Sequence, residues 1–207
     1  MDFTDITVLA AYATLVIELT VFPIPSEAST LDLFRHDRQD EVERNALIQA
    51  RNRSRASKLL RFLLPTSIGV GLFLMPLLAI LWPQLRTSFF PIRLEEAANT
   101  GLALIIAGRL ITFCSVLQLR SSKRRNRIPK GLFTFSRNPG LIGMFSFYIG
   151  LCLALGGPWL WLGLPLYFMN MHYRVCLEEA QLTAIHGDSW QTYQHRVARY
   201  LPIPGLK

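Results

Sequence analysis

Residues 140–173 read GLIGMFSFYIGLCLALGGPWLWLGLPLYFMNMHY and contain no Asp, Glu, Lys or Arg. Two apolar runs, residues 140–155 and 159–173, are separated only by Gly156, Gly157 and Pro158. A membrane-spanning helix needs about 20 mostly apolar residues, so both runs are short but close to that length. The Gly-Gly-Pro sequence predicts a tight turn between two antiparallel helices. This stretch therefore predicts a helical hairpin in a membrane.

Three further apolar runs precede the hairpin, at about residues 6–24, 62–82 and 97–119. Pro65 and Pro76 are expected to kink the second run. Apolar residues make up 51% of the chain and charged residues only 17%, with a mean hydropathy of +0.28. A soluble domain carries about 25% charged residues. The sequence thus predicts an all-α, polytopic membrane helix bundle with about five transmembrane helices.

The basic residues of the chain gather in alternate loops. Segments 25–61 and 120–137 are rich in Arg and Lys, whereas the loop between the second and third spans has only Arg86 and Arg93. Cytoplasmic loops of membrane proteins carry the excess of Lys and Arg. We therefore expect a multi-pass protein with its N-terminus outside and its C-terminus in the cytoplasm. The mixed-charge stretch 30–58 is expected to be an interfacial or solvated helix. Nucleic-acid binding is not expected, because the net charge of +8 follows the membrane topology.

Two charged residues lie inside predicted spans, Glu18 in the first and Arg109 in the third. Ionisable groups in a membrane are costly, so they usually face protein or water. Either the two residues pair with one another, or Arg109 lines a substrate cavity. Neither the three cysteines nor the four histidines have the spacing of metal ligands, so no metal site is predicted.

The first candidate site is the stretch 131–143, where the chain leaves the second basic loop and enters the hairpin. Pro139 is well placed in the first turn of a helix. Free backbone N–H groups at that helix start can hold an anion, and Arg137 adds a planar cation suited to a carboxylate or phosphate. The alternative is that Arg137 is only a positive flank of the span, beside an ordinary helix start.

The second candidate site follows the fifth span. Arg174 and Glu178 are four residues apart and share one helix face, and Glu179 adds a second carboxylate. Such a pair of carboxylates can receive a sulfonium, an amine or ribose hydroxyls. The alternative is a solvated helix with an Arg–Glu pair. After it comes a tail with a rough apolar stripe, which predicts a short interfacial helix that caps a cytoplasmic site and ends at Pro202. The stripe consists of Leu182, Ile185, Trp190, Tyr193 and Val197.

The order of these elements resembles the superfamily of isoprenylcysteine carboxyl methyltransferases and phospholipid N-methyltransferases. Its members carry Gly-x-x-x-x-x-Arg-His-Pro-x-Tyr, a helical hairpin, Glu-Glu-x-x-Leu, a Gly, two tyrosines and a final Arg-x-x-Pro. The resemblance covers about residues 100–204. The matching residues are Gly131, Arg137, Pro139, Gly156–Pro158, Arg174, Glu178, Glu179, Leu182, Gly187, Tyr193, Val197, Arg199 and Pro202. The chain departs from the pattern at Asn138 (usually His), Leu141 (usually Tyr) and Trp190 (usually the first tail tyrosine).

The resemblance implies an S-adenosylmethionine-dependent methyltransferase that acts on a lipophilic acceptor at a membrane, with the cofactor pocket on the cytoplasmic side. It implies residues 1–95 as N-terminal membrane helices with a basic segment, and residues 96–207 as the catalytic core. Arg174 and Glu178 would then be catalytic. The cofactor would be bound by Arg137, Asn138, Pro139, Leu141, Glu179 and Tyr193.

Several points stay open at this stage. The acceptor is an isoprenylcysteine-like carboxylate, a phospholipid amine or another lipophile. Membrane reductases of the sterol type share the Arg-His-Pro region but use NADPH, and they are the first alternative. A non-catalytic relative that binds anionic lipid through its basic loops is the second. Nothing in the sequence indicates an oligomeric state.

Overall fold

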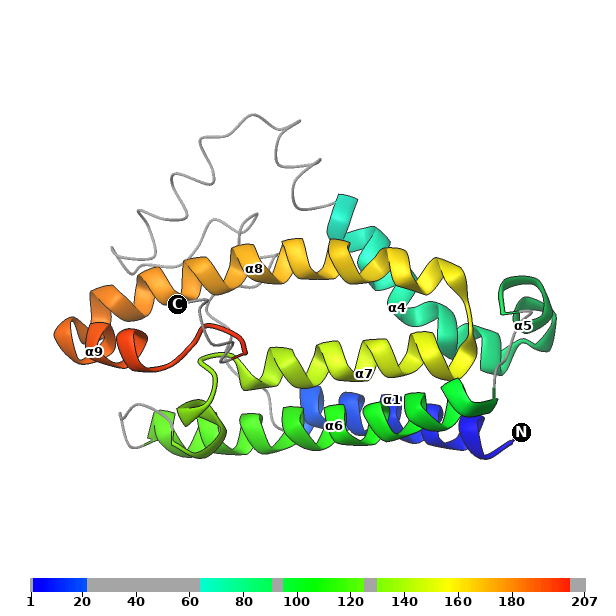
Figure 1. The fold of residues 1–207 in the computed structure, drawn as a ribbon, viewed down its shortest axis with the longest axis horizontal. Helices are drawn as coiled ribbons and strands as arrows, with labels where there is room; N and C mark the ends of the chain where they lie inside the picture. The colour runs from blue at the N-terminus through cyan, green and yellow to red at the C-terminus, as the bar shows by residue number, and fades with distance from the viewer. Residues whose placement is uncertain (1, 22–63, 91–94, 125–129, 202–207) are drawn as a thin grey trace.

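The computed structural model describes residues 2–21, 64–90, 95–124 and 130–201, and throughout these ranges the regular structure is helical (Figure 1). This confirms the predicted all-α class. The basic segment 25–61, the predicted helix within it, and Pro202 lie outside the described residues. The elements are α1 (Phe3–Val21), α4 (Leu64–Leu81), α5 (Pro83–Phe89), α6 (Glu95–Arg124), η2 (Gly131–Thr134), α7 (Pro139–Leu155), α8 (Pro158–His186) and α9 (Asp188–Arg196).

Each of the five predicted spans overlaps one of the long helices. Among the described residues, one helix, Glu95–Ser122 within α6, is long and apolar enough to cross a membrane, and Ser67–Leu81 and Pro139–Leu155 are shorter apolar helices. The count of five spans therefore stays a prediction.

The predicted hairpin turn is confirmed. Gly156 ends α7 with a left-handed backbone (φ 69°), a conformation that favours glycine, and Pro158 takes the first turn of α8. Pro139 likewise begins α7, as predicted.

Two helices end at other residues than predicted, and one short helix was not predicted. The span expected to end at residue 173 continues in α8 to His186, because no Gly or Pro interrupts residues 166–186. Glu178 and Glu179 therefore stand on the same helix as the hairpin. The tail helix α9 ends at Arg196, not at Pro202, since Val197 is already extended (φ −117°, ψ 129°). The short α5, begun by Pro83, was not predicted.

Helices α6 and α7 pack so closely that their backbones touch. A Cβ atom at Gly108 would lie 2.5 Å from the carbonyl oxygen of Gly143, and one at Gly150 would lie 2.6 Å from that of Gly101. These pairings run in opposite chain directions, so the helices are antiparallel. Small residues let membrane helices approach in this way. The resulting α6–α7 pair carries the start of α7, where the first candidate site lies.

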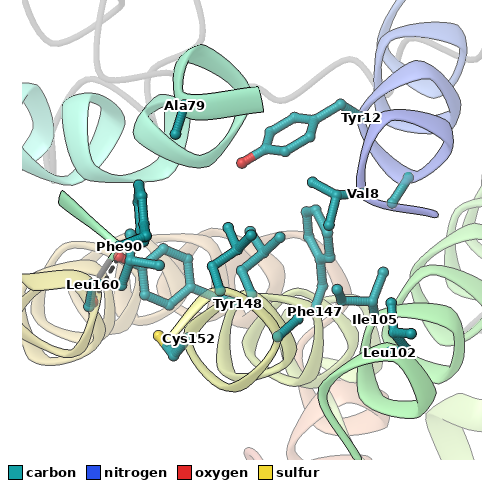
Figure 2. Close-up of a cluster of buried hydrophobic side chains, with 14 residues drawn as sticks. Val8, Tyr12, Ala79, Phe90, Leu102, Ile105, Phe147, Tyr148, Cys152 and Leu160 are labelled. Carbon is teal, nitrogen blue, oxygen red and sulfur yellow. Dashed lines mark hydrogen bonds between the residues drawn. The ribbon is translucent and has the colours of Figure 1, made fainter. Parts of the chain in front are cut away.

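The apolar core joins the N-terminal helices to the hairpin (Figure 2). Tyr12 of α1 packs edge-on against Phe147 of α7, with ring centroids 5.7 Å apart, and against Phe73 of α4 at 5.3 Å. The Tyr148 hydroxyl donates to the carbonyl oxygen of Leu160 at 2.8 Å, which ties α7 to α8 beside their turn. The division of the chain near residue 95 stays a prediction about sequence organisation, since helices from both sides share this core.

Close to Phe147 of this core, Glu18 of α1 and Arg109 of α6 form a buried ion pair. Arg109 also donates from Nε to the hydroxyl of Thr14 at 3.2 Å, and its guanidinium lies 5.9 Å from the ring centre of Phe147. The sequence left two roles open for Arg109, and the structure supports the pairing. The pair fixes α1 against α6.

The outside of the bundle is also apolar. Along α6, Ile106, Leu110, Phe113 and Leu117 are 49%, 60%, 37% and 41% exposed, and their spacing places them on one helix face. Large exposed apolar surface is unfavourable in water and is what a lipid-facing helix presents.

Candidate functional site

Three segments meet at the end of the bundle away from the hairpin turn. They are residues 136–138 before α7, the second half of α8, and residues 197–201 after α9, which we call the strap. Figure 1 shows the strap turning back from α9 toward the start of α7. The approach to α7 is shaped by Gly131, whose positive φ of 76° starts η2, and by Gln118 of α6, which accepts a hydrogen bond from the N–H of Leu132 at 2.9 Å.

The centre of the site is the carboxylate of Glu179, which is only 7% exposed. Arg137 Nη1 lies 3.1 Å from one carboxylate oxygen. Arg199 donates from Nε to both oxygens at 3.2 and 3.1 Å, and from Nη2 to the second at 2.8 Å. We call these three residues the arginine–carboxylate triad. Two cations and one anion leave it with one net positive charge, and the hydrogen bond to Glu179 raises the pKa of Arg199.

Hydrogen bonds to the backbone carbonyl groups of the strap hold it against the first candidate site. The N–H of Arg137 donates to the carbonyl oxygen of Ala198 at 2.9 Å. The side-chain amide of Asn138 donates to the carbonyl oxygen of Arg199 at 3.0 Å, and the hydroxyl of Ser136 reaches the same oxygen at 3.4 Å. Asn138 is thus used by the strap, which is a role that the sequence did not suggest.

The start of α7 differs from the predicted anion site. The N–H groups of Leu141 and Ile142 bond to the carbonyl oxygen of Asn138, at 3.1 and 3.3 Å. Those of Arg137 and Asn138 bond to the strap and to the Ser136 hydroxyl. None of these four donors is free for an anion. The guanidinium of Arg137 is a group at this position that still has an unused hydrogen-bond donor, at Nε.

Arg137 is held in place but has an unused donor. Its Nε is buried without a hydrogen-bond partner, one of two such side-chain atoms in the described part of the chain. With its amide oriented to satisfy its neighbours, Gln194 of α9 accepts from Trp190 Nε1 at 2.9 Å and from Arg137 Nη1 at 3.2 Å. A buried donor without a partner is costly, so Nε marks a point where an outside acceptor would be stabilised.

The remaining predicted site residues lie around the triad or apart from it. Pro139 is buried and Leu141 half-buried at the start of α7. The hydroxyl of Tyr193 donates to the carbonyl oxygen of Phe133 at 2.8 Å, which joins α9 to η2, and burial raises its pKa to about 12. Glu178 is half-buried, and the triad does not include it. Arg174 lies on α8, and its side chain is outside the described ones.

Arg199 is the site residue that the prediction left out. It matched the tail of the sequence pattern, but nothing in that pattern connected it to Glu179, which lies 20 residues earlier. No group of three or more His, Cys, Asp or Glu residues that could hold a metal ion occurs among the residues described.

Comparison with known proteins finds a family match that includes Arg137 and Glu179 but ends before the strap and Arg199. Residues 97–189 match the family model of phospholipid methyltransferases. Similar proteins include the protein-S-isoprenylcysteine O-methyltransferase of Tribolium castaneum, which is 28% identical over 59% of this chain and 49% of its own length. Those of Homo sapiens (26% identical over 62% of this chain and 47% of its own) and Schizosaccharomyces pombe (27%, 49% and 42%) are also similar. The chain spans about half the length of these curated relatives. No solved structure matches it significantly.

Proposed function

We propose that this chain is an integral membrane methyltransferase of the superfamily of phospholipid and isoprenylcysteine methyltransferases, which it resembles through residues 97–189. We assign it S-adenosylmethionine as methyl donor and a lipophilic molecule as acceptor. The names of the similar proteins favour an isoprenylcysteine-like carboxylate over a phospholipid amine as the acceptor group.

The observation that carries this proposal is the arginine–carboxylate triad with the unpartnered Nε of Arg137. S-adenosylmethionine has a carboxylate, an ammonium group and ribose hydroxyls. The guanidinium groups of Arg137 and Arg199 suit the carboxylate, and Glu179 suits the ammonium group or the hydroxyls. The residues present therefore fit the cofactor. When bound, it supplies a methyl group on a positively charged sulfur.

The protein's own contribution is positioning and electrostatics. The strap and α9 hold Arg137 through Ala198 and Gln194, so its guanidinium is ordered before a ligand arrives. Tyr193 holds α9 on η2. Phe135, directly before residues 136–138, and Leu201, in the strap, are 69% and 56% exposed, which gives a lipophilic acceptor apolar surface beside the polar site. We keep Arg174 and Glu178 of α8 as the proposed catalytic pair.

The test is calorimetry of S-adenosylhomocysteine binding to the detergent-purified protein, with Glu179→Gln as the variant. We expect binding by the unchanged protein and a loss of at least about tenfold in the variant, because a charge-assisted contact is worth about 1.5–3 kcal/mol. Glu96→Gln is the matched control, since Glu96 is exposed in the first turn of α6. Absence of binding in all three proteins would overturn the proposal. It would favour the reductase or the non-catalytic lipid-binding protein. Binding of NADPH would then indicate the reductase, and binding to anionic vesicles without NADPH binding would indicate the lipid-binding protein.

We also propose that the triad faces the cytoplasm. Its support is the clustering of basic residues in segment 120–137, next to the triad, whereas the acidic Asp5 at the start of α1 pairs with Arg86 of α5 at 2.8 Å. Reporter tags on the two termini test this orientation. A C-terminal tag that is accessible only from outside would contradict it.

A further inference from the structure

A thiol and an imidazole lie in contact beside the triad. Cys176 and His172 are one turn apart on α8, with Cys176 Sγ 3.6 Å from His172 Nε2. The other ring nitrogen of His172, Nδ1, lies 2.8 Å from the hydroxyl of Tyr200 in the strap. Tyr200 is the residue after Arg199, so this thiol–imidazole pair touches the same segment that delivers Arg199 to Glu179.

The three cysteines of the chain differ in their surroundings. Cys152 is 1% exposed in the core, and Cys114 is exposed on α6, the helix that is long and apolar enough to cross a membrane. Cys176 is half-buried at the polar end of α8 and has an imidazole partner. A neighbouring imidazole is a feature that makes a thiol reactive.

The surroundings of the pair are apolar on one side. Phe168, one turn before His172 on α8, stacks on the imidazole with the ring centres 5.7 Å apart and the planes at 24°. Phe168 is itself 42% exposed and its neighbour Met169 65% exposed. A reagent that reaches Cys176 along this side must be compatible with an apolar surface.

We propose that Cys176 is a modification site, at which His172 activates the thiol for addition to a lipophilic α,β-unsaturated carbonyl compound. In this addition His172 takes the thiol proton. The sulfur forms a bond to the β-carbon of the electrophile while the carbon–carbon π bond breaks. The proton then returns, through solvent, to the α-carbon, so the adduct contains all atoms of both reactants and no oxidant is needed.

The modification would also act on the triad. An added group on the sulfur would displace the imidazole of His172, whose other ring nitrogen contacts the hydroxyl of Tyr200 in the strap. Displacement of Tyr200 would also move Arg199, the neighbouring residue, and so weaken the ion pair between Arg199 and Glu179. The modified protein is then expected to bind the cofactor less well. This consequence rests on the proposed function, whereas the reaction at Cys176 does not.

The reaction is tested with N-ethylmaleimide on the full chain in detergent, with peptide mass spectrometry to follow each cysteine. We expect Cys176 to react at least about tenfold faster than Cys114, as an imidazole-activated thiol does relative to an unactivated one. His172→Gln should lower the rate at which Cys176 reacts with N-ethylmaleimide severalfold. Tyr200→Phe, which keeps the thiol–imidazole contact, should not slow it. Equal rates at Cys114 and Cys176, or a His172→Gln rate equal to that of the unchanged protein, would overturn the proposal.

The effect on the triad is measured by S-adenosylhomocysteine calorimetry before and after the reaction. Affinity should fall in the unchanged protein, while Cys176→Ser should keep its affinity after the same treatment. Fast modification of Cys176 that leaves the affinity intact would overturn the coupling to the strap. If the untreated protein does not bind the ligand at all, the proposed function fails, and the rates still decide whether Cys176 is the reactive site.

Discussion

Arg199 contacts both carboxylate oxygens of Glu179, although 20 residues and the whole of α9 separate them in the chain. The contact is a fork of N–H groups on a buried carboxylate, which is a geometry that arginine matches and lysine does not. This contact joins the strap to α8. Because Arg137 also pairs with Glu179, the buried carboxylate is neutralised by two arginines.

The hydrogen bonds from Arg199 to both oxygens of Glu179 predict that Arg199→Lys weakens cofactor binding even though the charge is kept. A lysine ammonium cannot donate to both oxygens in one plane, so we expect about a tenfold loss of S-adenosylhomocysteine affinity, or about 1.4 kcal/mol. Calorimetry measures it. Arg196→Lys is the matched control, because Arg196 is exposed at the end of α9. Equal affinities for the two variants would show that charge alone matters at residue 199.

The contact between α6 and α7 predicts that a single methyl group at Gly108 destabilises the protein. Its Cβ would lie 2.5 Å from backbone atoms of α7, which cannot move as a side chain end can. We expect Gly108→Ala to lower the free energy of unfolding by about 1–3 kcal/mol, as overpacking of a tight core does. Thermal unfolding in detergent checks this.

Gly71→Ala in α4 is the control for that experiment. Nothing lies within 4 Å of a Cβ at Gly71, and alanine is the better helix former. The control is therefore expected to unfold at the same temperature as the unchanged protein or slightly above it. Equal losses in the two variants would contradict the close helix contact.

The buried pair of Glu18 and Arg109 predicts non-additive effects on stability. Arg109→Met leaves the carboxylate of Glu18 buried without its cation, which costs about 3–5 kcal/mol. Replacing both residues, as Glu18→Gln with Arg109→Met, removes the stranded charge and should recover part of the loss. Thermal unfolding of the two single variants and the double variant forms a double-mutant cycle. Simple addition of the single effects would mean that the two residues do not interact.

Tyr193 predicts a loss of stability at alkaline pH. Burial raises its pKa from 10.0 to about 12 in the folded protein. Between these values the unfolded chain releases the phenol proton while the folded one keeps it, so stability is full below pH 10 and falls as the pH rises toward 12. Unfolding temperatures measured from pH 8 to 12 should therefore decline less steeply in Tyr193→Phe than in the unchanged protein. Parallel curves would exclude the contribution of Tyr193.

Tyr193→Phe is also expected to lose stability by an amount that does not depend on pH. Removal of the hydroxyl leaves the carbonyl oxygen of Phe133 without its donor, which costs about 1 kcal/mol at neutral pH. The comparison therefore concerns the slope of each curve and not its height.

Some features of the fold were predictable because their signals are local. Gly156 and Pro158 set the hairpin turn through backbone geometry at those very positions, and Pro139 begins α7 for the same reason. The pairing of Glu18 with Arg109 was one of two expected outcomes, since a charge inside an apolar helix has few favourable partners. The length of α8 was underestimated, because the end of the apolar run was taken as the end of the helix.

The amino-acid sequence alone determined the helical class, the hairpin turn, the helix start at Pro139 and the residues that match the methyltransferase pattern. Only the tertiary structure decided that Arg199 holds Glu179, that Asn138 holds the strap, and that Cys176 and His172 meet Tyr200. The physical reason is the distance along the chain over which each kind of interaction acts. Backbone preferences act over a few residues and can be read along the chain, whereas the contacts of a side chain depend on which segments the packing of α6, α7 and α8 brings together.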